Sequence, residues 1–308
     1  MSADLAPTAL FDHPTLESIA SFLSEEIARD DRATRATSGH GTTPRASTTT
    51  RRSVAVVACR LSAPGRARSR AASRELARLA LVANTRVPAA RWASPRRGAG
   101  AAATYGSFAS EDQLGLDRAA FGISAAEARS MDPQQSLVLC VGYDALRGGD
   151  GFESSTAATA RRDALANSSV GVFVGVEPSG LSGADQATVF SASGGALSVT
   201  SGRLSYSLGL VGPCYSIDTA CASALAALHA CVLALRIGDE CDDGLAVGTK
   251  VLSEAANVAT STAGMTSARG RCHTFDLRAD GYCRGEGCGA FLVRASSRGE
   301  AAVLGSAV

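Results

Sequence analysis

Residues 212–225 read Gly212-Pro-Cys-Tyr-Ser-Ile-Asp-Thr-Ala-Cys-Ala-Ser-Ala-Leu225, and this stretch decides the fold. Polar and apolar residues alternate from 214 to 217, which predicts a short strand. From 222 to 235 the chain is rich in alanine and leucine, and an apolar stripe at helical spacing predicts a helix. The stripe consists of Leu225, Leu228, Val232 and Leu235. Cys221 is therefore expected at the point where a strand turns into a helix.

This position favours a reactive cysteine. The N-terminus of a helix offers free N–H groups and the positive end of the helix dipole, which favour a thiolate over a thiol. A thiolate is the nucleophilic form of cysteine. The neighbours Ala220 and Ala222 are small and leave room for a bulky substituent on the sulfur. The alternative is that Cys221 is a small buried hydrophobic residue, as free cysteines often are.

The pattern Gly-Pro-x-x-x-x-Asp-Thr-Ala-Cys-x-Ser resembles the active-site signature of β-ketoacyl synthases, specifically the ketosynthase domains of modular type I polyketide synthases. Two further stretches resemble other signatures of this family: Met131-Asp-Pro-Gln-Gln135 and Asp280-Gly-Tyr-Cys-Arg-Gly-Glu-Gly287. The resemblance covers residues 53–308 and only the front part of the family's domain. It implies an α/β, thiolase-like layered α-β-α-β-α fold, with the first half nearly complete and the second half only begun.

The resemblance also implies an activity. Ketosynthases extend a polyketide or fatty acid chain by decarboxylative Claisen condensation, and Cys221 is identified as the residue that holds the acyl chain as a thioester. The expected class is an acyltransferase of the β-ketoacyl-carrier-protein synthase type. No directly bound cofactor and no metal are expected. The implied substrates are phosphopantetheine-linked acyl thioesters on a partner acyl carrier domain, and the implied assembly is a homodimer through the ketosynthase.

Two histidine blocks of the resembling enzymes, His-Gly-Thr-Gly-Thr and Asn-x-x-His, do not occur in this sequence. Its four histidines, His13, His40, His229 and His273, match neither block. We therefore expect a fragment of a multidomain synthase whose single half exposes an apolar face and aggregates or folds loosely. Two alternatives stay open: a noncatalytic thiolase-like binding module or pseudoenzyme, and a protein that only transfers acyl thioesters through Cys221.

Three segments are predicted along the chain. Residues 1–28 are expected to be the C-terminal remnant of a carrier domain, because Leu10-Phe-Asp-His-Pro-Thr-Leu16 resembles the stretch before that domain's last helix. Residues 29–52 are rich in Thr, Ser and Arg and predict a flexible linker. Residues 53–308 are expected to form the truncated ketosynthase domain.

Composition excludes several other classes. The 308 residues carry a net charge of +1 and 45% apolar residues, which suits a globular core and gives no overall attraction to a polyanion. Residues 29–97 hold sixteen arginines against three acidic residues, but aromatic residues are scarce there, so a solvated segment is favoured over nucleic-acid or membrane binding. The nine cysteines form no Cys-x-x-Cys pair, so no zinc site is expected. Unpaired cysteines are typical of a reducing compartment, and a cytoplasmic location is therefore expected. The apolar run 219–235 is interpreted as a buried helix rather than a membrane span.

Several residues outside the central stretch receive structural interpretations. Buried-type strands are expected at 53–61, 170–175 and 244–248, and two final strands are expected at 291–293 and 302–304. Gln134 and Gln135 are expected to form structural hydrogen bonds rather than to catalyse. Lys250 stands where the resembling family usually has a neutral residue, and it is expected to be solvated rather than to form a Schiff base.

Overall fold

The computed structural model describes residues 52–79, 81–92, 104–147, 163–181, 188–237, 240–296 and 298–306. The chain divides into two compact units, residues 1–50 and 51–308. The expected carrier remnant (1–28) and linker (29–52) lie outside the described residues, apart from Arg52. Their assignment stays a prediction, and the second unit alone is described below.

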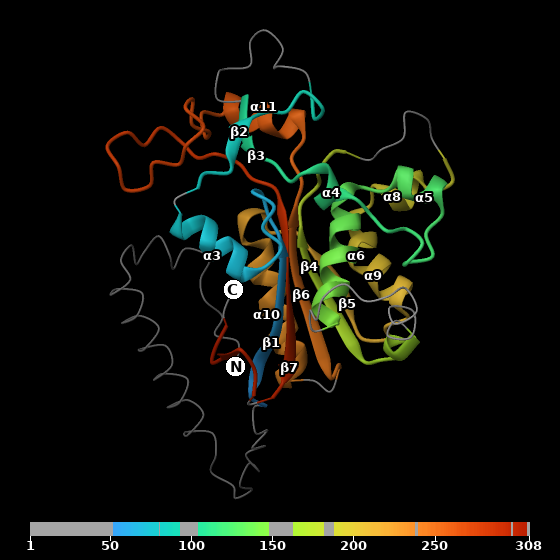
Figure 1. Ribbon diagram of the computed structural model, residues 1–308. Helices are drawn as coiled ribbons and strands as arrows, with labels where there is room; N and C mark the ends of the chain where they lie inside the picture. Colours follow the sequence, from blue (N-terminus) through green and yellow to red (C-terminus); the bar gives the residue numbers. More distant parts are fainter. Residues whose placement is uncertain are drawn as a thin grey trace, which may run out of the picture. The chain divides into compact units, whose positions relative to one another are not determined.

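A six-stranded mixed sheet forms the centre of this unit (Figure 1). Its strands follow the order β5 (Cys214–Ile217), β4 (Val170–Val176), β6 (Asp243–Lys250), β7 (Gly287–Ala295), β1 (Val54–Ser62) and β8 (Ala301–Val303). Strand β4 runs parallel to both β5 and β6, whereas β7 is antiparallel to β6 and β1. A separate hairpin pairs β2 (Asn84–Arg86) with β3 (Tyr105–Ser107). The strands expected at 53–61, 170–175, 244–248 and 291–293 are confirmed as β1, β4, β6 and part of β7, and the strand expected at 302–304 is confirmed as β8, one residue earlier.

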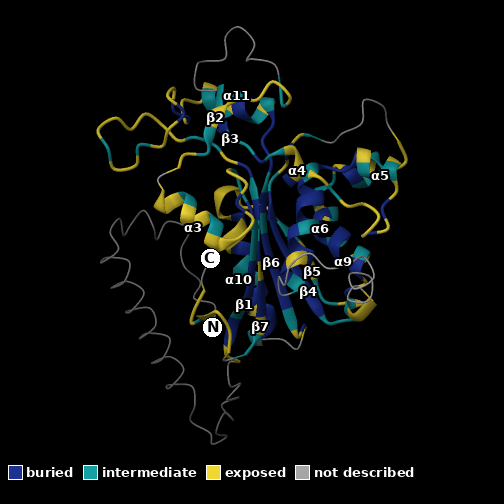
Figure 2. Ribbon diagram, in the orientation of Figure 1, coloured by how far each residue is buried: buried dark blue, intermediate teal, exposed yellow. Residues whose placement is uncertain are grey.

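Helices cover both faces of the sheet (Figure 1). Helices α6 (Pro133–Leu146) and α9 (Leu197–Leu208) pack on one face, and α10 (Ser223–Ile237) packs on the other. Successive side chains of a strand point to opposite faces, so Val172 and Val174 join the core under α6 and α9 while Phe173 joins the core under α10. All of β4 is buried, as its unbroken apolar sequence predicts (Figure 2).

The remaining helices are short and frame this core. They are α3 (Arg70–Arg78), α4 (Glu111–Leu114), α5 (Ala125–Ser130), α8 (Ser191–Gly194), the 3-10 turn η2 (Ala220–Ala222) and α11 (Glu254–Thr262). Helix α6 begins as its sequence dictates: the Asp132 side chain accepts a hydrogen bond from the Gln134 backbone at 2.8 Å, and Pro133 occupies the first turn. The described part of the chain has no helix that is both long and apolar enough to cross a membrane.

The helix expected over 222–235 is confirmed as α10, but its apolar stripe is only partly buried. Val232 and Leu235 are fully buried under the sheet, whereas Leu225 is 70% exposed. The expectation that the whole stripe is buried is therefore wrong at Leu225. The reason is that Leu225 lies in the first turns of α10, where the helix faces an open cavity instead of the sheet.

Candidate active site

Cys221 lies on a tight turn between β5 and α10. The strand ends at Ile217, the 3-10 turn η2 spans Ala220–Ala222, and α10 begins at Ser223. Ala220 adopts a left-handed backbone conformation with φ of 52°, which costs free energy for a residue with a Cβ. Such strain persists only when the surroundings enforce it, and here it brings the Cys221 side chain to the surface. The interpretation of Cys221 as a buried hydrophobic residue is wrong.

The side chain of Ser223 holds this turn in place. Its hydroxyl accepts a hydrogen bond from the Thr219 backbone N–H at 2.8 Å and donates one to the Ala220 carbonyl at 2.7 Å. Asp218 adds a third bond, because its carboxylate accepts from the Ala220 backbone N–H at 3.0 Å. Ser223 is itself buried, so its two bonds are shielded from water, whereas the Asp218 bond is exposed. We refer to residues 218–223 as the elbow.

A glycine at the end of β4 allows the elbow to sit this close to the sheet. A Cβ added to Gly175 would stand 2.4 Å from the backbone carbonyl carbon of Ser223. A glycine in the neighbouring strand β6 also allows a close approach, since a Cβ added to Gly248 would stand 2.7 Å from the Cβ of Ala224. The two glycines near the ends of β4 and β6 therefore allow the first turn of α10, and with it Cys221, to lie close to the sheet.

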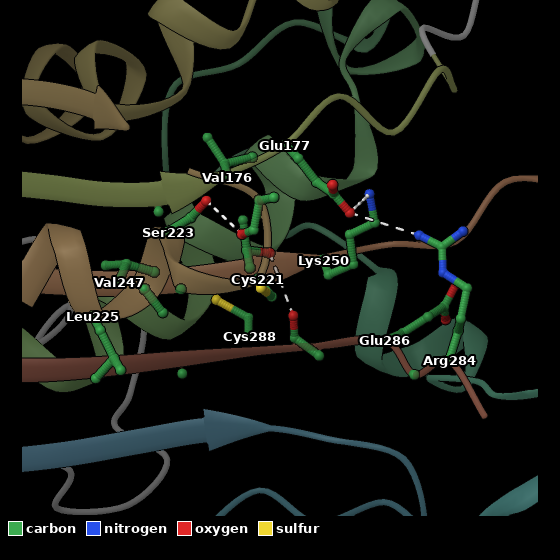
Figure 3. Close-up of a pocket in the computed structure, with 18 of the residues that line it drawn as sticks. Val176, Glu177, Cys221, Ser223, Leu225, Val247, Lys250, Arg284, Glu286 and Cys288 are labelled. Carbon is green, nitrogen blue, oxygen red and sulfur yellow. Dashed lines mark hydrogen bonds and ion pairs between the residues drawn. The ribbon is translucent and has the colours of Figure 1, made fainter. Parts of the chain in front are cut away.

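Cys221 opens into a cavity of about 920 Å³ (Figure 3). The elbow, the first turns of α10, the ends of β4 and β6, strand β7 and the segment before β7 contribute its lining. Most of the lining is apolar and includes Leu225, Leu228, Met265 and Phe291. An apolar cavity of this size beside an exposed nucleophile can accommodate a hydrocarbon chain attached to the sulfur.

Two other thiols line the same cavity, Cys283 and Cys288. Burial raises the pKa of the Cys288 thiol to about 12. Burial also raises the pKa of the Cys283 thiol to about 11, with a further contribution from nearby Cys272. Both are therefore almost entirely protonated at neutral pH, and Cys221 is the exposed thiol of the three.

Gln134 and Gln135 are confirmed as structural hydrogen bonders. The Gln134 side chain donates to the Glu177 carbonyl at 3.0 Å and accepts from the Val251 backbone at 3.0 Å, so it ties the end of β4 to the end of β6. Gln135 donates to the Ser193 carbonyl at 3.1 Å and accepts from Arg203 at 2.7 Å. Neither side chain lines the cavity.

The expectation that Lys250 is solvated is wrong. Its side chain is only 20% exposed, and its ammonium lies 2.5 Å from the carboxylate of Glu177. Arg284 lies on the other side of the same carboxylate at 3.6 Å (Figure 3). The parallel pairing of β4 with β6 brings the ends of the two strands side by side, so the opposite charges of Lys250 and Glu177 neutralise each other at the rim of the cavity.

Sequence reasoning missed Glu286, which connects three segments beside the site. Its carboxylate accepts hydrogen bonds from the backbone N–H of Leu252 at 2.9 Å and of Ala109 at 2.8 Å, and it pairs with Arg91. Burial raises the pKa of this carboxyl, while the two backbone bonds and Arg91 act in the opposite direction. The available signal was an acidic residue enclosed by two glycines in an apolar stretch, which indicates a buried, paired charge.

The described residues contain no group of three or more His, Cys, Asp or Glu side chains arranged for a metal ion. His229 and His273 lie outside the cavity lining, and His229 shares a hydrogen bond with Ser306 at 3.1 Å. No histidine is among the residues that line the cavity in the described part of the chain.

Comparison with known proteins places this geometry in a family. The family "Beta-ketoacyl synthase, N-terminal domain" matches residues 51–298. The non-reducing polyketide synthase ausA of Aspergillus calidoustus is 40% identical over 190 residues, which cover 60% of this chain and 7% of that synthase. A phenolphthiocerol/phthiocerol polyketide synthase of Mycobacterium tuberculosis is 39% identical over 192 residues, covering 62% of this chain and 12% of that protein. The matched part is thus a small fraction of each relative.

Solved structures agree with the fold. The ketosynthase from module 6 of the bacillaene synthase of Bacillus subtilis 168 superimposes with a TM-score of 0.64 at 28% identity, covering 79% of this chain and 40% of that one. An oxazolomycin ketosynthase domain from Streptomyces albus JA3453 gives a TM-score of 0.65 at 26% identity, covering 79% of this chain and 43% of that one. The predicted thiolase-like α/β fold, and the restriction of the resemblance to the front part of the domain, are confirmed.

Proposed function

The chain belongs to the β-ketoacyl synthase family through the family's N-terminal domain, and we propose that Cys221 is its acyl-accepting nucleophile in polyketide chain elongation. The observation that carries this proposal is the exposed Cys221 thiol, held on a strained elbow at an apolar cavity of about 920 Å³. A cysteine that only fills space in the core gains nothing from a strained turn that exposes its thiol.

In the first step the Cys221 thiolate attacks the carbonyl carbon of an acyl thioester. The new carbon–sulfur bond forms as the bond to the sulfur of the carrier's phosphopantetheine breaks, and the leaving thiolate takes up the proton that the Cys221 thiol gave up on ionising. Negative charge develops on the carbonyl oxygen during attack, and backbone N–H groups at the start of α10 are suitable donors to it. The apolar side chains of Leu225 and Leu228 would then lie beside the acyl chain.

In the second step a malonyl-type thioester loses carbon dioxide and its carbanion attacks the acyl-enzyme. This step builds up an enolate, which requires hydrogen-bond donors at its oxygen. The 308 residues contain neither of the histidine blocks that the resembling enzymes use. Condensation is therefore proposed for a polypeptide that carries those blocks together with this sequence.

A second candidate for the 308 residues by themselves is acyl transfer without condensation. The supporting observation is that the described cavity lining holds the nucleophile but no histidine. This candidate predicts that Cys221 exchanges acyl groups between thioesters and forms no carbon–carbon bond.

Incubation with an acyl thioester of N-acetylcysteamine, followed by intact-mass measurement and peptide mapping, tests the nucleophile. We expect one acyl group on Cys221, none on Cys221→Ala, and unchanged labelling of Cys214→Ala, which removes another exposed cysteine. Circular dichroism of each variant separates loss of the nucleophile from loss of folding. Labelling that persists in Cys221→Ala would refute the assignment. Malonyl carrier protein is then added to the acylated 308 residues and, separately, to an acylated polypeptide that also carries the histidine blocks. We expect carbon dioxide and a longer acyl product only from the second, and a longer product from the 308 residues would exclude transfer without condensation.

The proposed partners are an acyl carrier domain that presents the phosphopantetheine thioester and a second copy of this domain. Strand β5 supports the second partner because it is an edge of the sheet, with Cys214 and Tyr215 exposed on it. An unpaired edge strand presents backbone donors and acceptors that another strand can satisfy. The Val172 N–H donates to the Pro213 carbonyl, so the N–H of the next residue, Cys214, faces away from β4 and toward the free edge. Sedimentation of wild type and of Cys214→Pro tests this pairing, with dimer expected only for wild type. A Cys214→Pro variant that remains dimeric would exclude pairing through β5.

A further inference from the structure

Two cysteines, Cys272 and Cys283, flank an exposed loop between α11 and β7, and Figure 2 shows this loop as a largely exposed segment. Cys272 is exposed, and Cys283 is partly buried at the cavity that holds Cys221. The backbone N–H of Cys283 donates a hydrogen bond to the Cys272 sulfur at 3.2 Å. The Cys272 sulfur thus contacts the backbone of the other cysteine directly.

This contact places the Cβ of Cys283 close to the Cys272 sulfur, while the Cys283 sulfur itself lies 3.8 Å from the Arg284 carbonyl. The Cβ of any residue lies about 2.5 Å from its own backbone nitrogen, so the Cβ of Cys283 is a near neighbour of the Cys272 sulfur. A disulfide requires Cβ atoms about 3.8 Å apart and side chains that point toward each other. The influence of Cys272 on the pKa of the Cys283 thiol is consistent with such proximity.

Both arms of the loop are anchored to one buried residue, Ser267. On one arm, the Gly270 backbone N–H donates to the Ser267 carbonyl at 3.2 Å. On the other arm, the Ser267 backbone donates to the Tyr282 carbonyl at 2.9 Å, and its hydroxyl donates to Asp280 at 2.6 Å. The hydrogen bonds of Ser267 therefore tie the segment before Cys272 to the segment before Cys283 in the reduced protein.

We propose that Cys272 and Cys283 form a reversible disulfide that closes the loop at the edge of the Cys221 cavity. The oxidant is a small-molecule disulfide such as glutathione disulfide. The exposed Cys272 thiolate attacks one of its sulfurs and releases one glutathione thiol. The Cys283 thiol then loses its proton to solvent, and the resulting thiolate attacks the Cys272 sulfur and releases the second glutathione. Two protein thiols are thus oxidised as one disulfide is reduced, and the raised pKa of Cys283 makes this second step faster at higher pH.

The crosslink matters because the segment after Cys283 builds the cavity. Arg284, which lies near Glu177, and Glu286, which holds Ala109 and Leu252, follow directly in the chain. Between the cysteines the loop carries Phe275 and Leu277, both fully exposed. Oxidation therefore fixes the base of the loop to the wall of the cavity without consuming Cys221.

Trypsin digestion without reduction tests the proposal, because Arg271, Arg278 and Arg284 separate the two cysteines into different peptides. After exposure of the folded 308-residue protein to glutathione disulfide, we expect residues 272–278 linked to 279–284. The linked mass should be about 2 Da below the sum of the two peptides, and dithiothreitol should separate them. Cys272→Ser and Cys283→Ser should each abolish the linked pair, and Cys214→Ser, which removes an exposed thiol on β5, should retain it.

Two results would overturn the proposal, and both are read on the wild-type protein, so they do not depend on how a variant folds. One is glutathione attached to Cys272 while Cys283 remains free. The other is a link from Cys283 to Cys221, which would mean that the cavity and not the loop directs the pairing. The same oxidation in 6 M urea provides a reference, since an unfolded chain with nine cysteines should give many pairs instead of one.

Discussion

The elbow (218–223) and the start of strand β7 (287–289) border the same cavity, and each contributes a cysteine to it. At the elbow, Cys221 lies on a turn with a left-handed residue beside it and is exposed. In β7, Cys288 lies in a strand paired on both sides, and its side chain is 4% exposed. Its sulfur lies 3.8 Å from the Leu137 carbonyl, inside the core under α6.

The difference shows that backbone architecture, and not residue type or proximity to the cavity, decides whether a cysteine thiol is exposed or buried. A strand interior satisfies its own hydrogen bonds and turns alternate side chains into the core. A strained turn that leads into a helix directs its side chain away from the core and leaves backbone donors free. The thiol is consequently exposed at Cys221, where we propose a nucleophile, and packed in the core at Cys288.

Alkylation rates give the largest expected contrast between the two cysteines. A thiol with a pKa near 12 has a thiolate fraction of about 10⁻⁴ at pH 8, and Cys288 is also shielded from solvent. Iodoacetamide should therefore modify Cys221 at least about a thousandfold faster than Cys288 in the native protein. Peptide mapping at successive times measures both rates. Because the pKa is raised, the Cys288 rate should increase about tenfold per pH unit between pH 7 and 9. Comparable alkylation rates of Cys221 and Cys288 at pH 8 would show that the two thiols do not differ in reactivity.

Gly175→Ala, in the strand that packs against the elbow, should cause a larger loss of stability than Ser223→Ala within the elbow. The added Cβ would meet the Ser223 backbone at 2.4 Å, so β4 or α10 must move. We expect a loss of about 3 kcal/mol in unfolding free energy, together with loss of Cys221 acylation. Gly202→Ala in α9 is the matched control because its Cβ meets nothing within 4 Å, and it should stabilise the helix by about 1 kcal/mol. Urea unfolding measures both. Equal effects of the two substitutions would mean that the close approach is not needed.

The local architecture of the elbow was predictable from the sequence. The change from alternation at 214–217 to helical spacing after 222 fixed the strand, the helix and the position of Cys221 between them. The unbroken apolar run of β4 predicted burial on both faces, and Asp132 with Pro133 predicted the start of α6. These features depend on residues a few positions apart, which periodicity and capping describe well.

The neighbours of the site were not predictable in the same way. The pairing of Lys250 with Glu177 depends on β4 and β6 being adjacent and parallel, which no local pattern specifies. The exposure of Leu225 depends on what lies opposite the first turns of α10, and the burial of Glu286 depends on Ala109, Leu252 and Arg91 meeting at one carboxylate. Long-range neighbours decide whether a charge is solvated or an apolar residue is covered.

Ser223→Ala is the mildest test of the elbow, because it leaves the shape of the turn and removes only the hydroxyl. The Thr219 N–H and the Ala220 carbonyl lose their partner, which should cost about 2 kcal/mol in unfolding free energy. Without these bonds the strained conformation of Ala220 is less strongly enforced, so Cys221 should be acylated about tenfold more slowly. Urea unfolding and the time course of acylation measure the two effects on the same sample. Ser306→Ala removes a hydroxyl bonded to His229 on the surface and should change stability by less than about 0.5 kcal/mol. If Ser223→Ala lost stability but kept the wild-type acylation rate, the strained turn would contribute to stability and not to the reactivity of Cys221. Cys221 and Cys288 would then differ only in their exposure to solvent.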